Sequence, residues 1–136
     1  EDGLKDYLRS QLADREVLPA DLFTGSIKKT TEAADWAIGW TPEGVFEAST
    51  LSAQLAQTLD NTLAVLREAN AGPEHVARMT WYITDKRAYL GSLAEIGAIW
   101  REKMGRNFPA MAVVEVKALI EDAALIEIET TAVVPR

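Results

Sequence analysis

The chain of 136 residues contains no cysteine, which excludes disulfides, thiolate nucleophiles and cysteine-ligated metal sites. It has a single histidine, His75, so one chain cannot build a two-histidine ribonuclease site or a typical zinc site. No apolar run approaches the roughly 18 residues that a membrane span needs, and the polar, acidic start is unlike a secretory signal. We therefore expect a cytoplasmic protein without a membrane partner.

Positive charge is also scarce. The chain has 14 Lys and Arg residues against 21 Asp and Glu residues, a formal net charge of -7. Non-specific nucleic-acid affinity comes mainly from basic side chains that neutralise phosphates, so we expect no nucleic-acid partner. Glu127 and Glu129 share one face of a predicted strand, but no further ligands cluster with them. With no phosphate-cradling glycine loop either, the sequence predicts neither a metal nor a cofactor.

The length predicts one domain over residues 1–136. Its N-terminal part has a weak pattern: leucines at helical spacing predict a short amphipathic helix over Asp2–Asp14. The alternation in Trp36–Trp40 then predicts a strand. Pro42–Gly44 predicts a turn, after which Val45 and Phe46 begin the return.

The rest of the chain has clearer periods. A leucine stripe opened by Ser49 or Thr50 as N-cap predicts a helix that ends near Asn70, Gly72 and Pro73. Aromatic and β-branched residues then alternate through the predicted strand Met79–Thr84. Asp85 caps a second predicted helix, and two strands follow. The inner face of that helix carries Tyr89, Leu93, Ile96 and Trp100. The two strands are predicted over Ala110–Val116 and Ala124–Val134.

This order of elements predicts an α+β layer structure, a mixed β-sheet with two helices packed on one face. The outer face of the last strand is too mixed for a core, with Glu127 and Glu129 among apolar residues. An oligomer interface that includes polar groups accounts for such a face.

Several motifs between Ser52 and Val134 resemble the RidA/YjgF family, also called endoribonuclease L-PSP. The motifs occur in the family's order, and Ile38-Gly39-Trp40 with Pro42-Glu43-Gly44 also resembles the end of its N-terminal hairpin. They are Ala53-Gln54 through Asp60-Asn61 with Val65-Leu66, Trp81-Tyr82-Ile83-Thr84-Asp85, Phe108-Pro109-Ala110 with Val113-Val114-Glu115-Val116, and Ile126-Glu127-Ile128-Glu129 with Ala132. The segment 1–35 diverges from the family pattern and carries the extra predicted helix.

The resemblance implies a chorismate-mutase-like subunit in a homotrimer with a central barrel. Its sites would lie in clefts between subunits and would bind a small-molecule ligand. Family members hydrolyse imines and enamines, and the resemblance gives Glu127 the role of orienting the water. Where deaminating members have an arginine that grips the substrate carboxylate, this chain has Met111, which cannot form the bidentate fork.

The remaining candidate ligand contacts are Met111, Val113, Trp40 and Arg106, the last as a partial substitute for the missing arginine. Each has a plainer interpretation: Met111 and Val113 as core residues, Arg106 as a solvated surface charge, and Glu127 as an interface carboxylate. The leading hypothesis is a RidA-like homotrimer that hydrolyses an imine-type bond of a weakly anionic metabolite. The alternative is a non-catalytic metabolite-binding or regulatory scaffold, and a ribonuclease ranks third because of the charge and the lone histidine.

Overall fold

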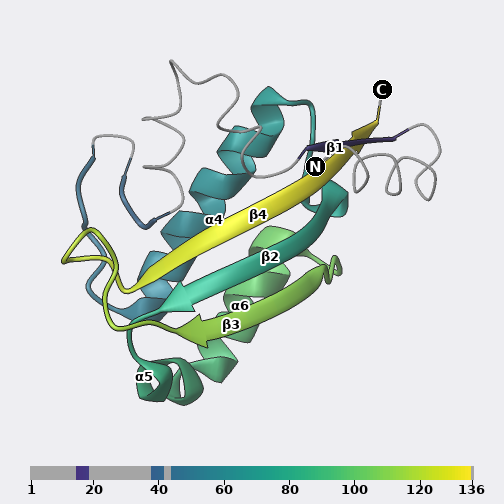
Figure 1. The fold of residues 1–136 in the computed structure, drawn as a ribbon. Coiled ribbons are helices and arrows are strands. Elements are labelled where there is room, and N and C mark those ends of the chain that lie inside the picture. Colours follow the sequence, from purple (N-terminus) through teal and green to yellow (C-terminus); the bar gives the residue numbers. More distant parts are fainter. Residues whose placement is uncertain (1–14, 19–37, 42–43, 136) are drawn as a thin grey trace.

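The computed structural model describes residues 15–18, 38–41 and 44–135, with side chains from Ile38 to Val133. In this part of the chain four strands form one sheet in the order β1-β4-β2-β3. The strands are β1 (Arg15–Leu18), β2 (Val76–Ile83), β3 (Ala110–Glu115) and β4 (Ile126–Pro135). β2 pairs with β3 in parallel and with β4 antiparallel, and β1 is antiparallel to the end of β4 (Figure 1). The sheet is therefore mixed, as predicted.

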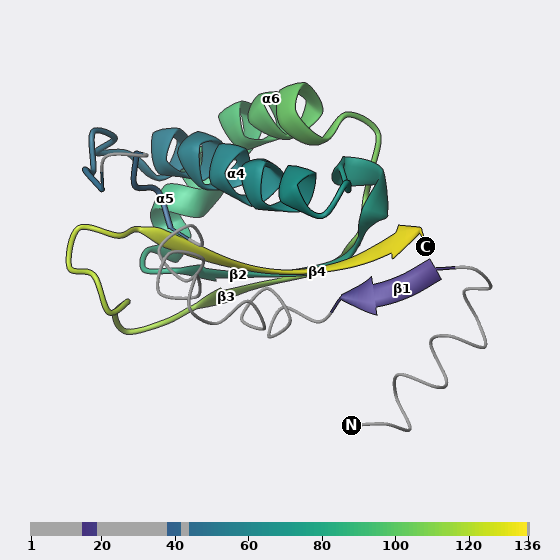
Figure 2. The ribbon, with the colours of Figure 1, turned by 90° about the horizontal axis from the view of Figure 1, so that it is seen from above.

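The helices lie on one face of this sheet (Figure 2). They are α4 (Leu51–Glu68), α5 (Lys86–Gly91) and α6 (Leu93–Met104), and a short 3₁₀ turn, η2 (Pro73–His75), leads into β2. The apolar core fills the layer between the helices and the sheet. Its members include Leu55, Leu59, Leu66, Met79, Trp81, Ile83, Trp100, Met104, Ile126 and Ile128. The predicted α+β class is confirmed.

Both ends of α4 follow from local chemistry. The Thr50 side chain accepts a hydrogen bond from the N–H of Ala53, which satisfies an N-terminal donor. At the other end Asn70 adopts φ 53°, and the N–H of Ala71 donates to the carbonyl of Leu66. This is a Schellman motif with asparagine in the left-handed position, and Pro73 follows it. The predicted helix and its end signals are confirmed.

The prediction of one helix after Asp85 was wrong. Asp85 does cap a helix, accepting from the N–H groups of Arg87 and Ala88 at 2.8 and 2.9 Å. That helix, α5, ends at Gly91, and α6 begins again at Leu93. The break changes the phase of the helical face, so Leu93 is 50% exposed instead of facing the core. Tyr89, Ile96 and Trp100 do pack against the core.

Of the predictions for residues 2–46, the turn at Gly44 is the one that the described residues confirm. The helix over Asp2–Asp14 and Trp36 lie outside the described residues. In the described part of the segment 36–40, Ile38 forms one isolated bridge, to Glu127, and no regular strand, and Val45–Phe46 is not a strand either. The turn is present, since Gly44 has φ 75° and its N–H donates to the carbonyl of Thr41 at 2.8 Å.

Candidate functional site

Glu127 lies in β4 on the sheet face that points away from α4 and α6. Its neighbours Ile126 and Ile128 are buried in the core, so strand alternation places the carboxylate on the opposite face. Tyr82 of β2 is its cross-strand partner on one side, and Ile38 bridges it on the other. The Glu127 side chain is consequently half-buried.

Burial raises the pKa of the Glu127 carboxyl above its ordinary value, and the nearby Glu129 carboxylate raises it further. Glu129 is more exposed and contacts Arg78 of β2, with Nη2 and Oε1 3.4 Å apart. A carboxyl with a raised pKa is a better proton acceptor and donor near neutral pH than an ordinary glutamate. The environment of Glu127 therefore suits an exchange of protons with a bound water.

Ile38 bridges Glu127 and lies two residues before Trp40, so the backbone around Trp40 runs beside Glu127. Trp40 is half-buried, and its ring meets the Phe46 ring edge-on with centroids 5.6 Å apart. The carbonyl groups of Ile38 and Trp40 both accept hydrogen bonds from the Asn61 side chain of α4. Glu127 and Trp40, two of the predicted site residues, thus lie on adjoining backbone segments.

Met111 and Val113 lie elsewhere, on the edge strand β3. They pair with Met79 and Trp81 of β2, whose side chains point into the core, so they occupy the helix side of the sheet. Val113 packs partly buried against that core, whereas Met111 is 42% exposed. Within one chain these two residues do not converge on Glu127, which lies on the other face with β2 between.

Arg106 is exposed in the turn between α6 and β3. Gly105 before it has φ 63° and ends α6, and the carbonyl of Asn107 accepts a hydrogen bond from the Trp100 indole at 3.1 Å. These contacts hold the turn in place and leave the Arg106 side chain at the surface. The roles assigned to Glu127, Met111, Val113, Trp40 and Arg106 remain predictions.

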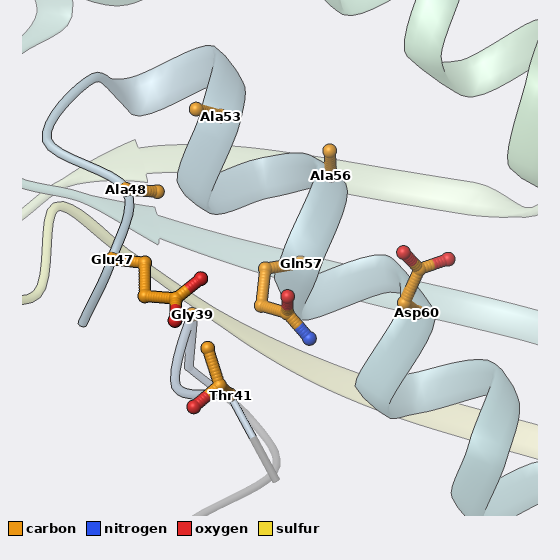
Figure 3. Close-up of a pocket in the computed structure, with 8 residues that line it drawn as sticks. All are labelled: Gly39, Thr41, Glu47, Ala48, Ala53, Ala56, Gln57 and Asp60. Atoms are coloured by element: carbon orange, nitrogen blue, oxygen red, sulfur yellow. The ribbon is translucent and has the colours of Figure 1, made fainter. Parts of the chain in front are cut away.

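A groove of about 300 Å³ lies between α4 and the segment before it, which lines the groove with residues 39, 41, 47 and 48 (Figure 3). Glu47 from the segment and Gln57 from α4 face one another across it, and Asp60 adds a second carboxylate at its rim. None of the predicted site residues lines it. This groove is complete within one chain, whereas a cleft between subunits needs two.

His75 is less exposed than a surface histidine, because only 15% of its side chain is accessible. Its Nδ1 atom accepts a hydrogen bond from the N–H of Gly72 at 2.9 Å, which gives it a structural role in the η2 turn. Among the described residues, no group of three or more His, Asp or Glu side chains could hold a metal ion. No helix in that part of the chain is long and apolar enough to cross a membrane.

Sequence reasoning missed the role of two buried amides on α4. Gln54 and Asn61 are 1% and 2% exposed, and both bond to backbone outside the helix. The signal was available: both lie on the face of the predicted helix that carries the leucine stripe, where an unpaired polar group is costly.

A mixed sheet with helices on one face is an α+β fold, and several solved structures share this fold with the chain. A Rid-family protein of unknown function from Yersinia pestis, YyfB, is 34% identical to this chain with a TM-score of 0.63, over 71% of this chain and 72% of that one. RidA from the Antarctic bacterium Psychrobacter sp. PAMC 21119 is 25% identical with a TM-score of 0.60, over 70% and 73%.

Residues 37–134 match the family described as Endoribonuclease L-PSP, so this chain belongs to that family. A RutC family protein of Haemophilus influenzae is 33% identical over 81 residues, which is 60% of this chain and 62% of that protein. A stretch of 44 residues is 48% identical to a DNA topoisomerase 4 polypeptide of the same organism, 32% of this chain but 7% of that polypeptide. The chain therefore spans a small part of the topoisomerase polypeptides it matches, and this match shows neither their fold nor their activity.

Proposed function

We propose that this chain forms a homotrimer that binds a small metabolite in clefts between subunits and hydrolyses an imine- or enamine-type bond. The observation that carries the proposal is the position of Glu127, half-buried between Tyr82 and Ile38 with a raised pKa. In the reaction, water adds to the carbon of the C=N bond while the Glu127 carboxylate accepts a proton from that water. The proton then passes to the nitrogen, which gives an amino alcohol. Glu127 next carries the hydroxyl proton to the amine, so that the carbonyl forms and ammonia leaves.

The trimer is supported by the surface that the described residues leave open. In the described part of the chain no helix covers the outer face of the sheet, and the edge strand β3 is mostly exposed on both faces. Large apolar side chains are exposed on β3 and just before it: Met111 is 42%, Val114 41% and Phe108 74% exposed. Clustered exposed apolar residues mark interaction surfaces more often than free surface. A second subunit packed here could bring its β3 strand near the first subunit's Glu127.

The ligand is proposed to carry less negative charge than the substrates of arginine-containing relatives. Met111 offers a polarisable apolar contact, with Val113 packed beside it. Trp40, two residues after the Ile38 that bridges Glu127, is the proposed aromatic contact, and Arg106 provides the exposed cation closest in sequence to Met111. A lone surface arginine holds a carboxylate less firmly than a desolvated bidentate fork does.

A non-catalytic binding protein is the second candidate, and Met111 favours it. Without a carboxylate clamp a substrate would be oriented poorly, whereas binding alone tolerates a looser fit. Such a protein would show ligand-dependent thermal stabilisation without turnover.

The test is an imine assay in which an amino-acid oxidase generates imines in place and the released ammonia is followed. Imines from glycine, alanine and bulkier amino acids should be hydrolysed faster with the protein present. Glu127→Gln should remove the acceleration, since the amide cannot accept the proton, and a loss of about 100-fold is the usual scale for a general base. Turnover that survives in Glu127→Gln would contradict the mechanism, and stabilisation without turnover would favour the binding protein.

A further inference from the structure

We propose that Asn61 and Gln54 of α4 are positioning residues, which hold the backbone on both sides of Glu127 for the hydrolysis proposed above. The inference deepens that proposed function and rests on it. Neither side chain touches the sheet face on which Glu127 lies, so both would act through the backbone.

Gln54 is tied to the start of β4. Its Nε2 atom donates to the carbonyls of Ala48 and Ala123 at 3.0 and 2.8 Å, and its Oε1 atom accepts from the N–H of Leu125 at 2.7 Å. Leu125 immediately precedes β4 and lies two residues before Glu127. One N–H donor and the carbonyl oxygen of this amide therefore fix the entry of the chain into β4, while the other donor holds the backbone at Ala48, before α4.

Asn61 holds the segment on the other side of Glu127. Its Nδ2 atom donates to the carbonyls of Ile38 and Trp40 at 2.8 and 2.9 Å. Gln57 donates from Nε2 to Asn61 Oδ1 at 2.9 Å, which orients the amide with both donors toward the segment. Among the described residues Ile38 has a single bridge to Glu127, so these bonds add a second attachment that ties its segment to α4.

Gly39, between the two bonded carbonyls, brings the segment into close contact with the helix. A Cβ atom at Gly39 would lie 3.1 Å from the Gln54 Cβ and 3.2 Å from the Gln54 Cα. The segment is thus held by two hydrogen bonds and by steric fit, all against one face of α4.

Two other buried polar residues of α4 provide the contrast. The hydroxyls of Thr58 and Thr62 donate to helix carbonyls four residues earlier, at 2.7 and 3.0 Å. The hydrogen-bonding needs of these two hydroxyls are therefore met within α4 itself. Gln54 and Asn61 differ from them because their bonds leave the helix and reach the two segments that flank Glu127.

Loosening the segment would expose Glu127 to water. The charged and titratable groups that face Glu127 are Glu129 on its own strand and the Tyr82 phenol on β2, while Arg78 pairs with Glu129. These groups stay in place when Asn61 is changed. The main effect is therefore on desolvation, and more water lowers the pKa of Glu127 toward its ordinary value.

The test compares Asn61→Leu with Thr62→Val in the full chain as it assembles. Each variant removes buried hydrogen bonds of α4, but Thr62 bonds only within the helix. Asn61→Leu should lower kcat for the imine by about tenfold or more, since displacement of a reacting group by ~1 Å can cost about 100-fold. The acid limb of its pH profile should move to lower pH, while Thr62→Val keeps the wild-type profile.

The second readout needs no turnover. With ¹³C-labelled glutamate, the carboxyl signal that is lost in Glu127→Gln identifies Glu127, and its titration midpoint should fall in Asn61→Leu. An unchanged midpoint would overturn the positioning role even if the protein is an active hydrolase. A lowered midpoint in a protein without turnover would reject the hydrolase proposal and keep the positioning role.

If Asn61→Leu does not fold, Gln57→Leu replaces it, because it removes the bond that orients Asn61 and keeps Asn61 itself. The midpoint should then shift in the same direction by a smaller amount. A Gln57→Leu midpoint equal to that of Thr62→Val would contradict the proposal.

Discussion

At the scale of single residues, Met111 stands where the proposed function would place a carboxylate-binding arginine. The side chain lies at the sheet edge, 42% exposed, next to the fully buried Met79. An arginine at this position could keep its guanidinium in water and lay its stem on the strand. Introducing the charge should therefore cost little stability, so that an effect on activity can be interpreted directly.

Met111→Arg should increase kcat/KM for imines that carry a carboxylate. A charge-assisted bidentate hydrogen bond contributes about 1.5–3 kcal/mol, roughly 10- to 100-fold in kcat/KM. Met111→Leu is the neutral control, and Met111→Lys should gain less because it lacks the fork. Ammonia release with carboxylated and uncarboxylated imines measures the difference. No gain with the carboxylated substrate would mean that Met111 does not face the ligand or that other parts of the cleft differ.

At the scale of elements, the sequence was most informative where a period and its end signals agree. The leucine stripe, the Thr50 cap and the Asn70–Pro73 end predicted α4, and alternation predicted β2, β3 and β4. The break at Ser92 was missed because the apolar spacing runs straight through it. The Ile38 bridge was mistaken for a strand because a single bridge and a strand share the same local alternation.

The site could be predicted less well than the fold, for a physical reason. Alternation along β4 correctly placed Glu127 and Glu129 on one face, opposite the core. The register between β3 and β2 places Met111 and Val113 on the helix side of the sheet. A register between two strands cannot be read from the residues of one strand alone. The bonds of Gln54 and Asn61 join residues far apart in sequence and were invisible for the same reason.

Gly39→Ala tests the contact between the segment and α4. The added Cβ would meet the Cα and carbonyl oxygen of Gln54 at 3.2 Å, so helix backbone has to shift. Overpacking of this kind costs about 1–3 kcal/mol. Gly97→Ala in α6 is the matched control, since its Cβ meets only a flexible Arg101 atom at 3.7 Å. That change should stabilise the protein by about 0.5–1 kcal/mol through helix propensity. Denaturant unfolding measures both, and equal effects would show that the segment does not need its close approach.

At the scale of the whole molecule, the sheet has one face covered by helices and one face open among the described residues (Figure 2). On the open face Val114, Tyr82 and Glu127 form one row across three strands. An apolar residue, a phenol and a half-buried carboxylate in one row suit an interface that also contains a binding site. The proposed trimer and the proposed site therefore depend on the same surface.

Val114→Asp should break the proposed homotrimer. Val114 is 41% exposed on the open face, and a carboxylate there would lose its water when subunits associate. Leu90→Asp is the control, because Leu90 is 52% exposed on α5, away from that face. Light scattering should give the trimer mass for the wild type and Leu90→Asp and a lower mass for Val114→Asp. Imine turnover should fall together with the trimer, because the proposed cleft needs two subunits. A wild type that stays monomeric at high concentration would contradict the intersubunit cleft, and the Glu127 environment would then have to bind its ligand within one chain.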